Sequence, residues 1–229
     1  MKHWIVLLAL LISCAQAFAQ ENRPTATARP LEIGAARWTD GFWADRLAVC
    51  RQRSHPAMWE IMRGDQYKPF LLHFQIAAGQ RDGDYHGAPW NDGDFYKFLE
   101  ATASLWALEP EPRLAQVLDE SIDVIAAAQR SDGYIHTPVL IRQRNGDAAA
   151  APFSDRADFE MYNMGHLLTA ACLHHRVTGS DAFLDVARRT ADFLASTFSN
   201  PTAELARNSV CPSHYMGAID MYRATGERR

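Results

Sequence analysis

The sequence predicts an all-α protein built from pairs of helices, and three observations support this fold class. From Trp38 onward, apolar residues recur mostly at helical spacing. Alternating runs rich in Val, Ile and Thr, which would indicate strands, are almost absent. A helix–turn–helix segment also recurs, because Arg176–Leu184 is echoed at Arg223–Arg229 and more loosely at Trp106–Leu114. Repeats of about fifty residues, each one a helix pair, are typical of α/α toroids and α-solenoids.

The helical pattern covers most of the chain. With boundaries set to within about three residues, the predicted helices are Phe42–Arg63, Pro69–Ala78, Asp94–Leu108, Arg113–Gln129, Phe159–Val177, Ala182–Phe198 and Ser213–Ala224. These roughly seven helices are little more than half of a closed ring of about twelve, so the terminal pair should leave apolar surface unpaired. The last repeat stops at Gly226–Arg229, where the earlier copy continues into a helix, and this predicts an incomplete toroid.

Residues that favour helix ends support these boundaries. The Asn91–Asp92 pair can cap the third predicted helix, and the Ser180–Asp181 pair can cap the sixth. Gly179 and Gly226 suit the left-handed backbone position that ends a helix.

One long irregular stretch, 129–158, interrupts the helical pattern. It begins with a turn at Asp132–Tyr134, continues into an expected short strand over Ile135–Arg142, and ends in an alanine-rich run. Long loops in compact domains are often functional, although a surface excursion is an equal alternative for the alanine-rich part. We assign no role to residues 144–153.

Length and composition indicate a soluble globular protein. The chain has 229 residues, of which 48% are hydrophobic, and its formal net charge is -4. This charge provides no basic field that would attract nucleic-acid phosphates or anionic membranes. Nucleic acid is therefore not an expected partner.

The first residues predict export from the cytoplasm. Lys2 and His3 precede an apolar run, and the small-residue site Ala17–Ala19 follows it, so residues 1–19 are predicted to be a signal peptide. The run is shorter than the roughly 20 residues of a membrane-spanning helix, so no transmembrane segment is expected. Alternatively, Leu11–Cys14 resembles a lipoprotein box in which Cys14 is acylated. Either reading places the protein in the periplasm or outside the cell.

The domain follows a polar leader. Residues 20–37 carry several Pro and Thr residues without a periodic apolar pattern, which predicts a flexible segment, and residues 38–229 form the helical domain. Beyond the signal peptide the chain keeps Cys50, Cys172 and Cys211. This odd number predicts at least one free thiol, and the helical position of Cys172 predicts a core residue.

Two helix starts combine ionisable and aromatic residues. In the segment 91–100, Asp92 and Asp94 could bind sugar hydroxyls, or they could simply cap the helix. In the segment 159–166, Glu160, Asn163 and His166 follow one another at a spacing of three, so they can share one helix face. A single histidine on an apolar helix is, however, more often a core residue than a catalytic one.

Two further segments carry histidines. His214 falls in the first turn of a helix that Ser213 can cap, where the helix dipole favours the neutral ring. A nucleophilic Cys211 beside it would lack an orienting third group. In the segment 132–137, Tyr134 and His136 could line a sugar subsite or belong to a plain turn. No metal site is expected, because adjacent histidines at 174 and 175 cannot face one ion from a helix.

These segments, taken in order, resemble the β-L-arabinofuranosidases of glycoside hydrolase family 127. The resemblance covers residues 38–229 and rests on five motifs in register, at Gly41–Arg46, Asp92–Ala101, Asp132–Tyr134, Glu160–Leu167 and Cys211–Arg223. It implies an (α/α)6 toroid, of which this chain would be the incomplete first part, with a central cavity that binds a furanose.

The resemblance also implies a chemistry and a set of site residues. Enzymes of this family are expected to use a cysteine nucleophile beside a zinc ion and a glutamate acid/base. The three cysteines at 50, 172 and 211 do not match that motif, so the catalytic residues and the zinc are expected beyond Arg229. His166 and His214 match positions that bind the sugar, and Asp94, Tyr162 and Glu160 are weaker matches to the cavity wall.

The residue types agree with a carbohydrate ligand. Neutral histidines and carboxylates suit ring hydroxyls, while Trp43, Trp90 and Tyr134 could offer stacking faces. No pair of groups here is both nucleophile and acid/base, so the chain alone is expected to be an inactive fragment of a glycoside hydrolase for glycans that contain L-arabinofuranose.

Two other functions remain open at this point. Another α/α-toroid enzyme, such as an unsaturated uronyl hydrolase, would use Asp92 or Asp94 to hydrate a double bond. A non-catalytic helical-repeat module that binds glycans would explain the short length as natural.

Overall fold

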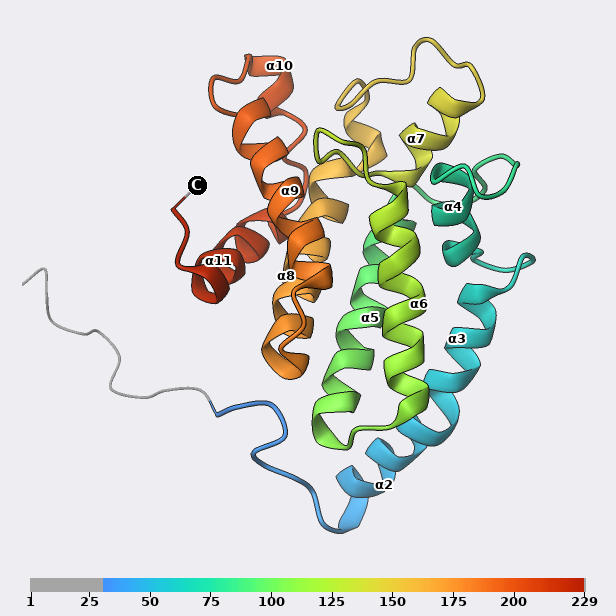
Figure 1. Ribbon diagram of the computed structural model, residues 1–229, viewed down its shortest axis with the longest axis vertical. Coiled ribbons are helices and arrows are strands. Elements are labelled where there is room, and N and C mark those ends of the chain that lie inside the picture. The colour runs from blue at the N-terminus through green and yellow to red at the C-terminus, as the bar shows by residue number, and fades with distance from the viewer. Residues whose placement is uncertain (1–30, 229) are drawn as a thin grey trace, which may run out of the picture.

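A computed structural model describes residues 31–228 (Figure 1). The predicted signal peptide, Cys14 and most of the leader lie outside the described residues. All regular elements of the described part are helices and none is a strand, which confirms the all-α prediction. No helix in this part is both long and apolar enough to cross a membrane.

The helices follow one another with short connections at most junctions. Their bounds are α2 Gly41–Val49, η1 Cys50–Ser54, α3 His55–Arg63, α4 Phe70–Ala77, α5 Asn91–Leu108, α6 Pro112–Ala128, α7 Thr137–Arg144, η2 Arg156–Asp158, α8 Glu160–Thr178, α9 Ala182–Thr197, α10 Ala203–Ala206 and α11 Ser213–Thr225. All the predicted helices are present, and their ends lie within a few residues of the predicted bounds.

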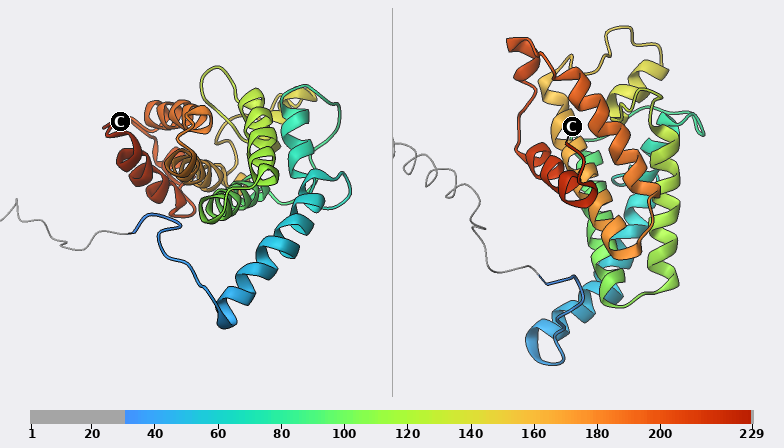
Figure 2. Two further views of the ribbon diagram at one scale, coloured as in Figure 1. Left: turned by 60° about the horizontal axis from the view of Figure 1, so that its bottom comes forward. Right: turned by 60° about the vertical axis from the view of Figure 1, so that its left-hand side comes forward.

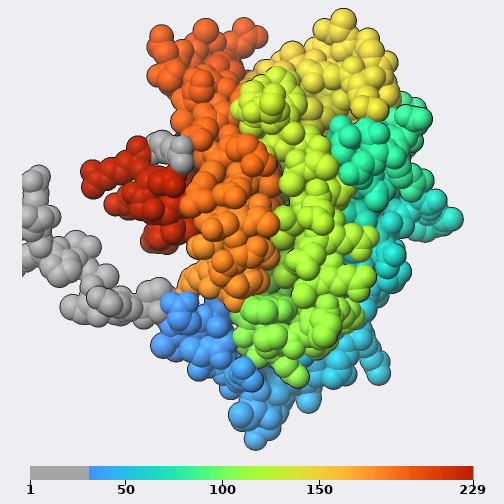
Figure 3. All heavy atoms as spheres, viewed as in Figure 1, coloured from blue at the N-terminus to red at the C-terminus, as the bar shows by residue number. Residues whose placement is uncertain are grey.

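The main helices form two layers. Figure 2 shows α5, α8 and α11 side by side in one layer, and α4, α6 and α9 in the other. From the side of the second layer, the atoms of α6 and α9 cover the middle of the molecule (Figure 3). The apolar side chains between the layers are fully buried, as at Phe95, Ile125, Leu167 and Phe183. Their burial supplies most of the stability of such a two-layer arrangement.

Glycines let the helices of the first layer approach closely. A Cβ added to Gly93 of α5 would lie 2.7 Å from Oδ1 of Asn163 in α8. A Cβ added to Gly165 of α8 would lie 2.4 Å from the backbone nitrogen of His214 in α11. Because Gly93, Gly165 and His214 all lie near the starts of their helices, the amino-terminal ends of α5, α8 and α11 lie together.

A long helical rod flanks α5. The segments α2, η1 and α3 are continuous, and the π-helical turn η1 ends just before Pro56, which has no N–H for a regular helical bond. The rod runs antiparallel to α5, since His55 bonds Thr102 at 2.8 Å and the Trp59 ring stacks on Phe98.

The strand expected at Ile135–Arg142 is wrong, because this run forms helix α7. Pro138 occupies the first turn, where a missing N–H costs nothing, and the carboxylate of Asp92 accepts the Thr137 N–H at 2.7 Å. The run is buried from Ile135 to Ile141, including the polar His136 and Thr137, so the sequence has no alternation of exposed and buried residues that would reveal a helical period.

The expected helix ends are confirmed in part. Gly179 and Gly226 end α8 and α11 with φ of 75° and 73°, as predicted. Asp92 does not cap α5, because its carboxylate bonds Thr137 instead. Ser213 does not cap α11 either, since its hydroxyl donates to the carbonyl of Tyr162.

Cysteines and exposed apolar residues follow the predictions. Cys50, Cys172 and Cys211 are all free, and Cys172 is buried against Met221. The terminal helix α11 exposes Tyr215, Met216, Ile219 and Tyr222, the unpaired apolar surface expected for the last helix pair.

Acid should destabilise the folded chain through two buried histidines. Burial is the main cause that lowers the pKa of His55 and of His73 to about 4, from 6.5 in the unfolded chain. Between these pH values the unfolded chain binds more protons, so the stability from the neutral rings is full above pH 6.5 and is lost as pH falls toward 4. Thermal melting between pH 7 and pH 5 should show this loss, and His73→Gln should reduce it. Equal pH dependence in both proteins would contradict the assignment.

Candidate functional site

A polar cluster lies where the starts of α5 and α8 meet. Asp94 and Lys97 stand one turn apart on α5, and Tyr162 and His166 stand one turn apart on α8. These spacings of three and four place each pair on one helix face. The prediction named Asp94, Tyr162 and His166 as cavity residues, and the structure brings these three together.

Lys97 connects the two helices of the cluster. Its Nζ donates to Oδ1 of Asp94 at 3.2 Å and to the hydroxyl oxygen of Tyr162, and it lies 4.7 Å from the centre of the Tyr162 ring. The Tyr162 ring in turn meets the His166 ring edge-on, with centroids 4.7 Å apart. The prediction omitted Lys97, although its spacing of three from Asp94 was a visible signal.

The charges of the cluster are balanced. Burial lowers the pKa of Lys97, but the hydrogen bonds with Tyr162 and Asp94 outweigh burial, so the net pKa is raised. Burial and then the positive charge of Lys97 lower the pKa of His166 to about 4, against an opposing effect of Asp94. His166 is therefore neutral near pH 7, with one ring nitrogen as a donor and the other as an acceptor.

The ring of His166 is available to a ligand. Within the described residues, its nitrogens form no hydrogen bond, and the side chain is only partly buried. A neutral imidazole with both nitrogens free can bond two neighbouring sugar hydroxyls.

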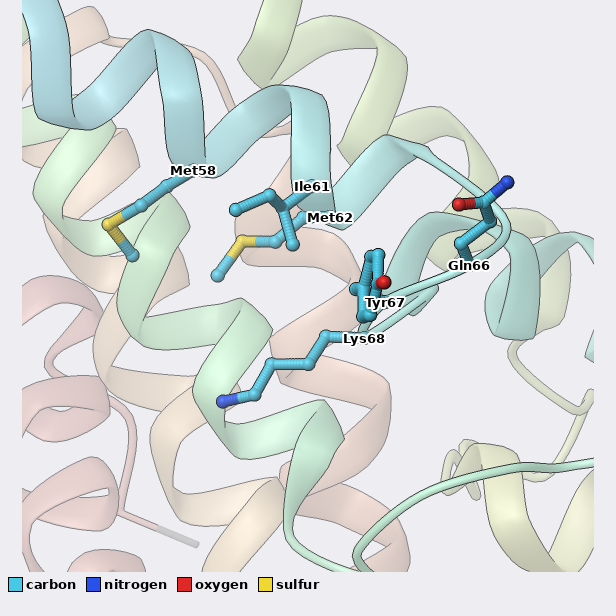
Figure 4. Close-up of a pocket in the computed structure, with 6 residues that line it drawn as sticks. All are labelled: Met58, Ile61, Met62, Gln66, Tyr67 and Lys68. Carbon is cyan, nitrogen blue, oxygen red and sulfur yellow. The ribbon is translucent and has the colours of Figure 1, made fainter.

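An apolar groove adjoins the cluster. It has a volume of about 620 Å³, lies between the α2–α3 rod and α5, and reaches Asp94 and Lys97 at one end. A second groove of about 610 Å³ shares Met58, Met62 and Lys68 with it. Figure 4 shows methionine and isoleucine side chains projecting from α3 into this second groove, with Tyr67 and Lys68 on the following loop. A polar cluster beside an apolar wall suits a sugar, which has both hydroxyl groups and C–H faces.

A polar hollow lies near the middle of α5 and shares Ser104 with the apolar groove. It has a volume of about 790 Å³ and lies between α5, α8 and α11, farther along each helix than the cluster. Glu100 and Asp220 both line it, and Thr169 donates to Asp220 at 3.1 Å. Burial, followed by the nearby charge of Asp220, raises the pKa of Glu100.

A buried network fixes the start of α5 and the start of α7. Asp92, only 2% exposed, accepts the N–H and the hydroxyl of Thr137 at 2.7 and 2.6 Å, and His136 lies 3.5 Å away. Asn163 accepts the Gly93 N–H at 2.7 Å and donates to the Pro89 carbonyl at 2.8 Å. Asp92 and Asn163 therefore hold the backbone at the starts of α5 and α7 in place, with His136 buried beside them.

Glu160 and Tyr134 form a second buried pair. The Tyr134 hydroxyl donates to Oε1 of Glu160, and the Phe153 N–H donates to Oε2 at 2.5 Å. Burial is the first cause that raises the pKa of both groups. The expected stacking role of Tyr134 is wrong, because its side chain is 0% exposed. Both Glu160 oxygens have internal partners, so its place in the fold is the junction of α8 with the preceding loop.

The backbone of His214 packs against Gly165, next to His166, but its ring borders a different groove. Its Nε2 pairs with the hydroxyl of Ser209 at 2.9 Å, and the ring borders a groove between α8, α9 and α11 together with Met161 and Leu168. Burial lowers the pKa of His214, against an opposing hydrogen bond with the Cys211 backbone, so the direction agrees with the prediction but the cause is burial rather than the helix dipole. Among the described residues the two imidazole rings have separate partners, Tyr162 for His166 and Ser209 and Tyr215 for His214, and sugar binding by His214 stays a prediction.

Of the other stacking candidates, Trp43 and Trp90 are exposed. Trp43 packs edge-on against Phe42 on α2, and Trp90 packs edge-on against Phe159 at the start of α8. Trp90 directly precedes α5, so it is the exposed indole that is nearest in sequence to the cluster.

No metal-binding group appears in the described part of the chain. Among residues 31–228, no set of three or more His, Cys, Asp and Glu side chains is placed to hold an ion. Burial raises the pKa of Cys172 to about 12, which makes its thiol a poor metal ligand or nucleophile.

Known proteins are similar to this chain in sequence and in architecture. Residues 35–229 match the family model described as the β-L-arabinofuranosidase GH127 catalytic domain. A non-reducing end β-L-arabinofuranosidase of Bifidobacterium longum subsp. longum is 31% identical over 214 residues, which cover 83% of this chain and 32% of that protein. The chain thus spans about a third of the length of this curated relative.

Solved structures agree with the match. A GH127 β-L-arabinofuranosidase from Geobacillus stearothermophilus T6 superposes with a TM-score of 0.72 and 28% identity, over 83% of this chain and 30% of that one. A GH127 β-arabinofuranosidase gives 0.72 and 25%, over 86% and 32%. A protein described as a glycoside hydrolase gives 0.59 and 38%, over 85% and 24%. GH127 structures are α/α toroids, so the predicted fold class is confirmed and the two layers are an arc of such a ring.

Proposed function

Because the chain belongs to glycoside hydrolase family 127, the β-L-arabinofuranosidase family, we propose that it forms a sugar-binding wall of an enzyme that releases L-arabinofuranose from glycans. The observation that carries this proposal is the cluster of Asp94, Tyr162 and His166 at the joined starts of α5 and α8. Its three groups offer a carboxylate, a phenol and a neutral imidazole to ring hydroxyls. An adjoining apolar groove would receive the C–H face of the sugar.

The bond-breaking groups are proposed to come from polypeptide other than residues 1–229. Retaining hydrolysis needs a nucleophile and an acid/base on either side of the glycosidic bond. In the described residues, Cys172 is buried with a raised pKa and Glu160 is bonded internally. Cys50 and Cys211 are more accessible, but they do not match the cysteine motif that the resemblance implies. The length of the curated relative, about three times that of the matched part, leaves room for them.

Zinc does not fit the described residues. The family resemblance implies a zinc ion beside a cysteine, but the side chains in the range 31–228 assemble no group of ligands for it. Any zinc of the complete domain would be held by other residues. In this chain, the described residues bind and orient the sugar.

Export is part of the proposal. The charged start, the short apolar run and the small-residue site of residues 1–19 support a signal peptide and a periplasmic or secreted protein. Such a location suits an enzyme that acts on large plant glycans. Mass spectrometry of the mature protein would show cleavage before Gln20, or lipid on Cys14.

Replacing His166 with alanine should weaken sugar binding by roughly tenfold or more, because two hydrogen bonds to hydroxyls are lost. The probe is methyl β-L-arabinofuranoside, titrated into the 229-residue chain and followed by NMR. Binding by the unaltered chain should saturate with a Kd on the order of millimolar, as is usual for a small neutral ligand. His175→Ala, on the same helix but near its other end, is the matched control and should bind normally.

An activity assay can contradict the proposal that this chain binds the sugar without cleaving it. The chain should not hydrolyse an aryl β-L-arabinofuranoside. Turnover that disappears in His166→Ala would show a complete catalytic site in this chain, and no saturable binding would contradict the sugar-binding proposal.

The two other functions are less well supported. A uronyl hydrolase would need Asp92 or Asp94 as a catalytic group, but Asp92 is buried in bonds to Thr137 and Asp94 is paired with Lys97. A non-catalytic module has no support from relatives whose names describe hydrolases. The family match therefore favours the hydrolase.

A further inference from the structure

The central residue of the cluster is one that neither the sequence prediction nor the family match singles out. We infer that Lys97 is a positioning residue that decides which atoms of Asp94, Tyr162 and His166 a bound sugar meets as donors and which as acceptors. The inference rests on the proposed function, since it assumes that the cluster faces a sugar.

Lys97 and Tyr162 share a hydrogen bond. A lysine ammonium has three donors and no acceptor, so the Tyr162 oxygen must accept from it. The phenolic proton then points away from Lys97 and is free to donate to another group. Lys97 therefore makes Tyr162 a donor toward a ligand.

The same reasoning applies to Asp94. Its Oδ1 accepts from Lys97 at 3.2 Å, while its Oδ2 makes no hydrogen bond within residues 31–228. The carboxylate is thus held in one orientation with one oxygen left as an acceptor. Lys97 therefore presents Asp94 to a ligand as an acceptor.

Lys97 also affects the third residue of the cluster, His166. The titratable groups around its ring are Asp94 and Lys97 from α5 and Tyr162 from α8 itself, whereas the ring of His214 on α11 borders a different groove. The positive charge of Lys97 opposes protonation of the neighbouring imidazole. His166 thus offers one donor and one acceptor.

These assignments define the chemical class of the ligand. The charge of Lys97 is matched by Asp94, so the cluster has no surplus charge for a carboxylate or phosphate. It offers alternating donors and acceptors, which suit the neighbouring hydroxyls of a neutral furanose. A sugar acid should therefore bind less tightly than the neutral sugar.

The experiment compares Lys97→Met with Lys97→Arg in the full 229-residue chain. Arginine keeps the charge and has only donors, whereas methionine has a similar length and neither property. Methyl β-L-arabinofuranoside is titrated by NMR, and the pKa of His166 is followed in the same samples through its labelled ring signals. His166→Gln identifies those signals.

The expected result is a loss of affinity of roughly tenfold or more in Lys97→Met, with most of it restored in Lys97→Arg. The pKa of His166 should rise from about 4 in Lys97→Met, because the cation is removed and Asp94 is left unpaired. In Lys97→Arg it should stay near its original value. A purely structural role would not produce this charge-dependent shift.

Three outcomes would overturn the inference. These are unchanged affinity in Lys97→Met, an unchanged His166 pKa in that variant, and an arginine variant that behaves like methionine. If the unaltered chain binds no sugar, the proposed function fails, while the pKa comparison still decides whether Lys97 sets the state of His166. If Lys97→Met does not fold, as judged by circular dichroism, Lys97→Gln makes the same comparison.

Discussion

Replacing Gly165 with alanine should lower the melting temperature of the chain by roughly 5–10 °C. The added Cβ would lie 2.4 Å from the backbone nitrogen of His214 and 2.4 Å from the carbonyl carbon of Ser213. Real Cβ atoms do not approach backbone so closely, and backbone cannot move aside as a flexible side chain can. α11 must therefore shift away from α8, which loses packing along their whole contact.

The matched control for this variant adds bulk where there is room. Ala127→Leu adds a larger apolar group to α6 at an exposed position, and its effect on stability should be within about 0.5 kcal/mol. Differential scanning calorimetry of both variants makes the comparison. Equal melting temperatures for Gly165→Ala and the unaltered chain would contradict the close approach of α8 and α11.

Replacing Asp92 with asparagine should reduce the free energy of unfolding by about 3 kcal/mol or more. The carboxylate accepts two hydrogen bonds from Thr137 in a site that is 2% exposed. An amide provides only one acceptor atom, which can keep the bond from the Thr137 N–H, while its NH2 group meets the Thr137 hydroxyl. The hydroxyl must then rotate to accept, and its own proton loses the carboxylate acceptor. The change therefore leaves at least one buried group of Thr137 without a partner.

Asp94→Asn is the control for this variant, because the residue lies one half-turn away on the same helix. Its carboxylate is partly exposed and is paired with a partly exposed Lys97, so the change should cost about 1 kcal/mol or less. Urea denaturation measures both variants. A smaller loss for Asp92→Asn than for Asp94→Asn would contradict the buried network.

The sequence predicted the helices well because most of them have one buried face. In α9, Phe183, Val186, Ala187 and Thr190 are buried at spacings of three, one and three, which is the pattern of an amphipathic helix. Helix ends that depend on backbone geometry alone, such as Gly179, were also predictable. Local sequence contains this information without any knowledge of the partner helix.

Helix α7 could not be predicted in the same way. Its side chains are buried on all sides from Thr137 to Ile141, so no polar face reveals the helical period. The carboxylate that holds its first N–H comes from Asp92, which lies 45 residues earlier in the chain. A contact over that sequence distance is set by the packing of the layers.

Some residues of the candidate site could be predicted from the sequence, and the placement of others could not. Asp94, Tyr162 and His166 were named as site residues through the family resemblance. Spacing alone suggested that His166 shares a face with Glu160 and Asn163, whose side chains instead form internal hydrogen bonds. Glu160 points elsewhere because Tyr134 and the Phe153 backbone draw its carboxylate into the core. The direction of His214 depends on how α11 packs on α8, which no local pattern reveals.

Both edges of the arc carry exposed apolar side chains. On one side these are Phe42, Trp43, Met58 and Ile61 of the α2–α3 rod, and on the other they are the four exposed residues of α11. In a closed toroid such edges meet further helices. The cluster of Asp94, Lys97, Tyr162 and His166 lies between the two edges, on the layer formed by α5, α8 and α11.

The most direct measurement of the central claim is an NMR map of the chemical shifts that methyl β-L-arabinofuranoside perturbs in the labelled chain. The account predicts that the largest shifts fall on the side chains of His166 and Tyr162, with smaller ones on Asp94 and Lys97. Shifts confined to the groove beside His214, or spread evenly over the surface, would contradict it.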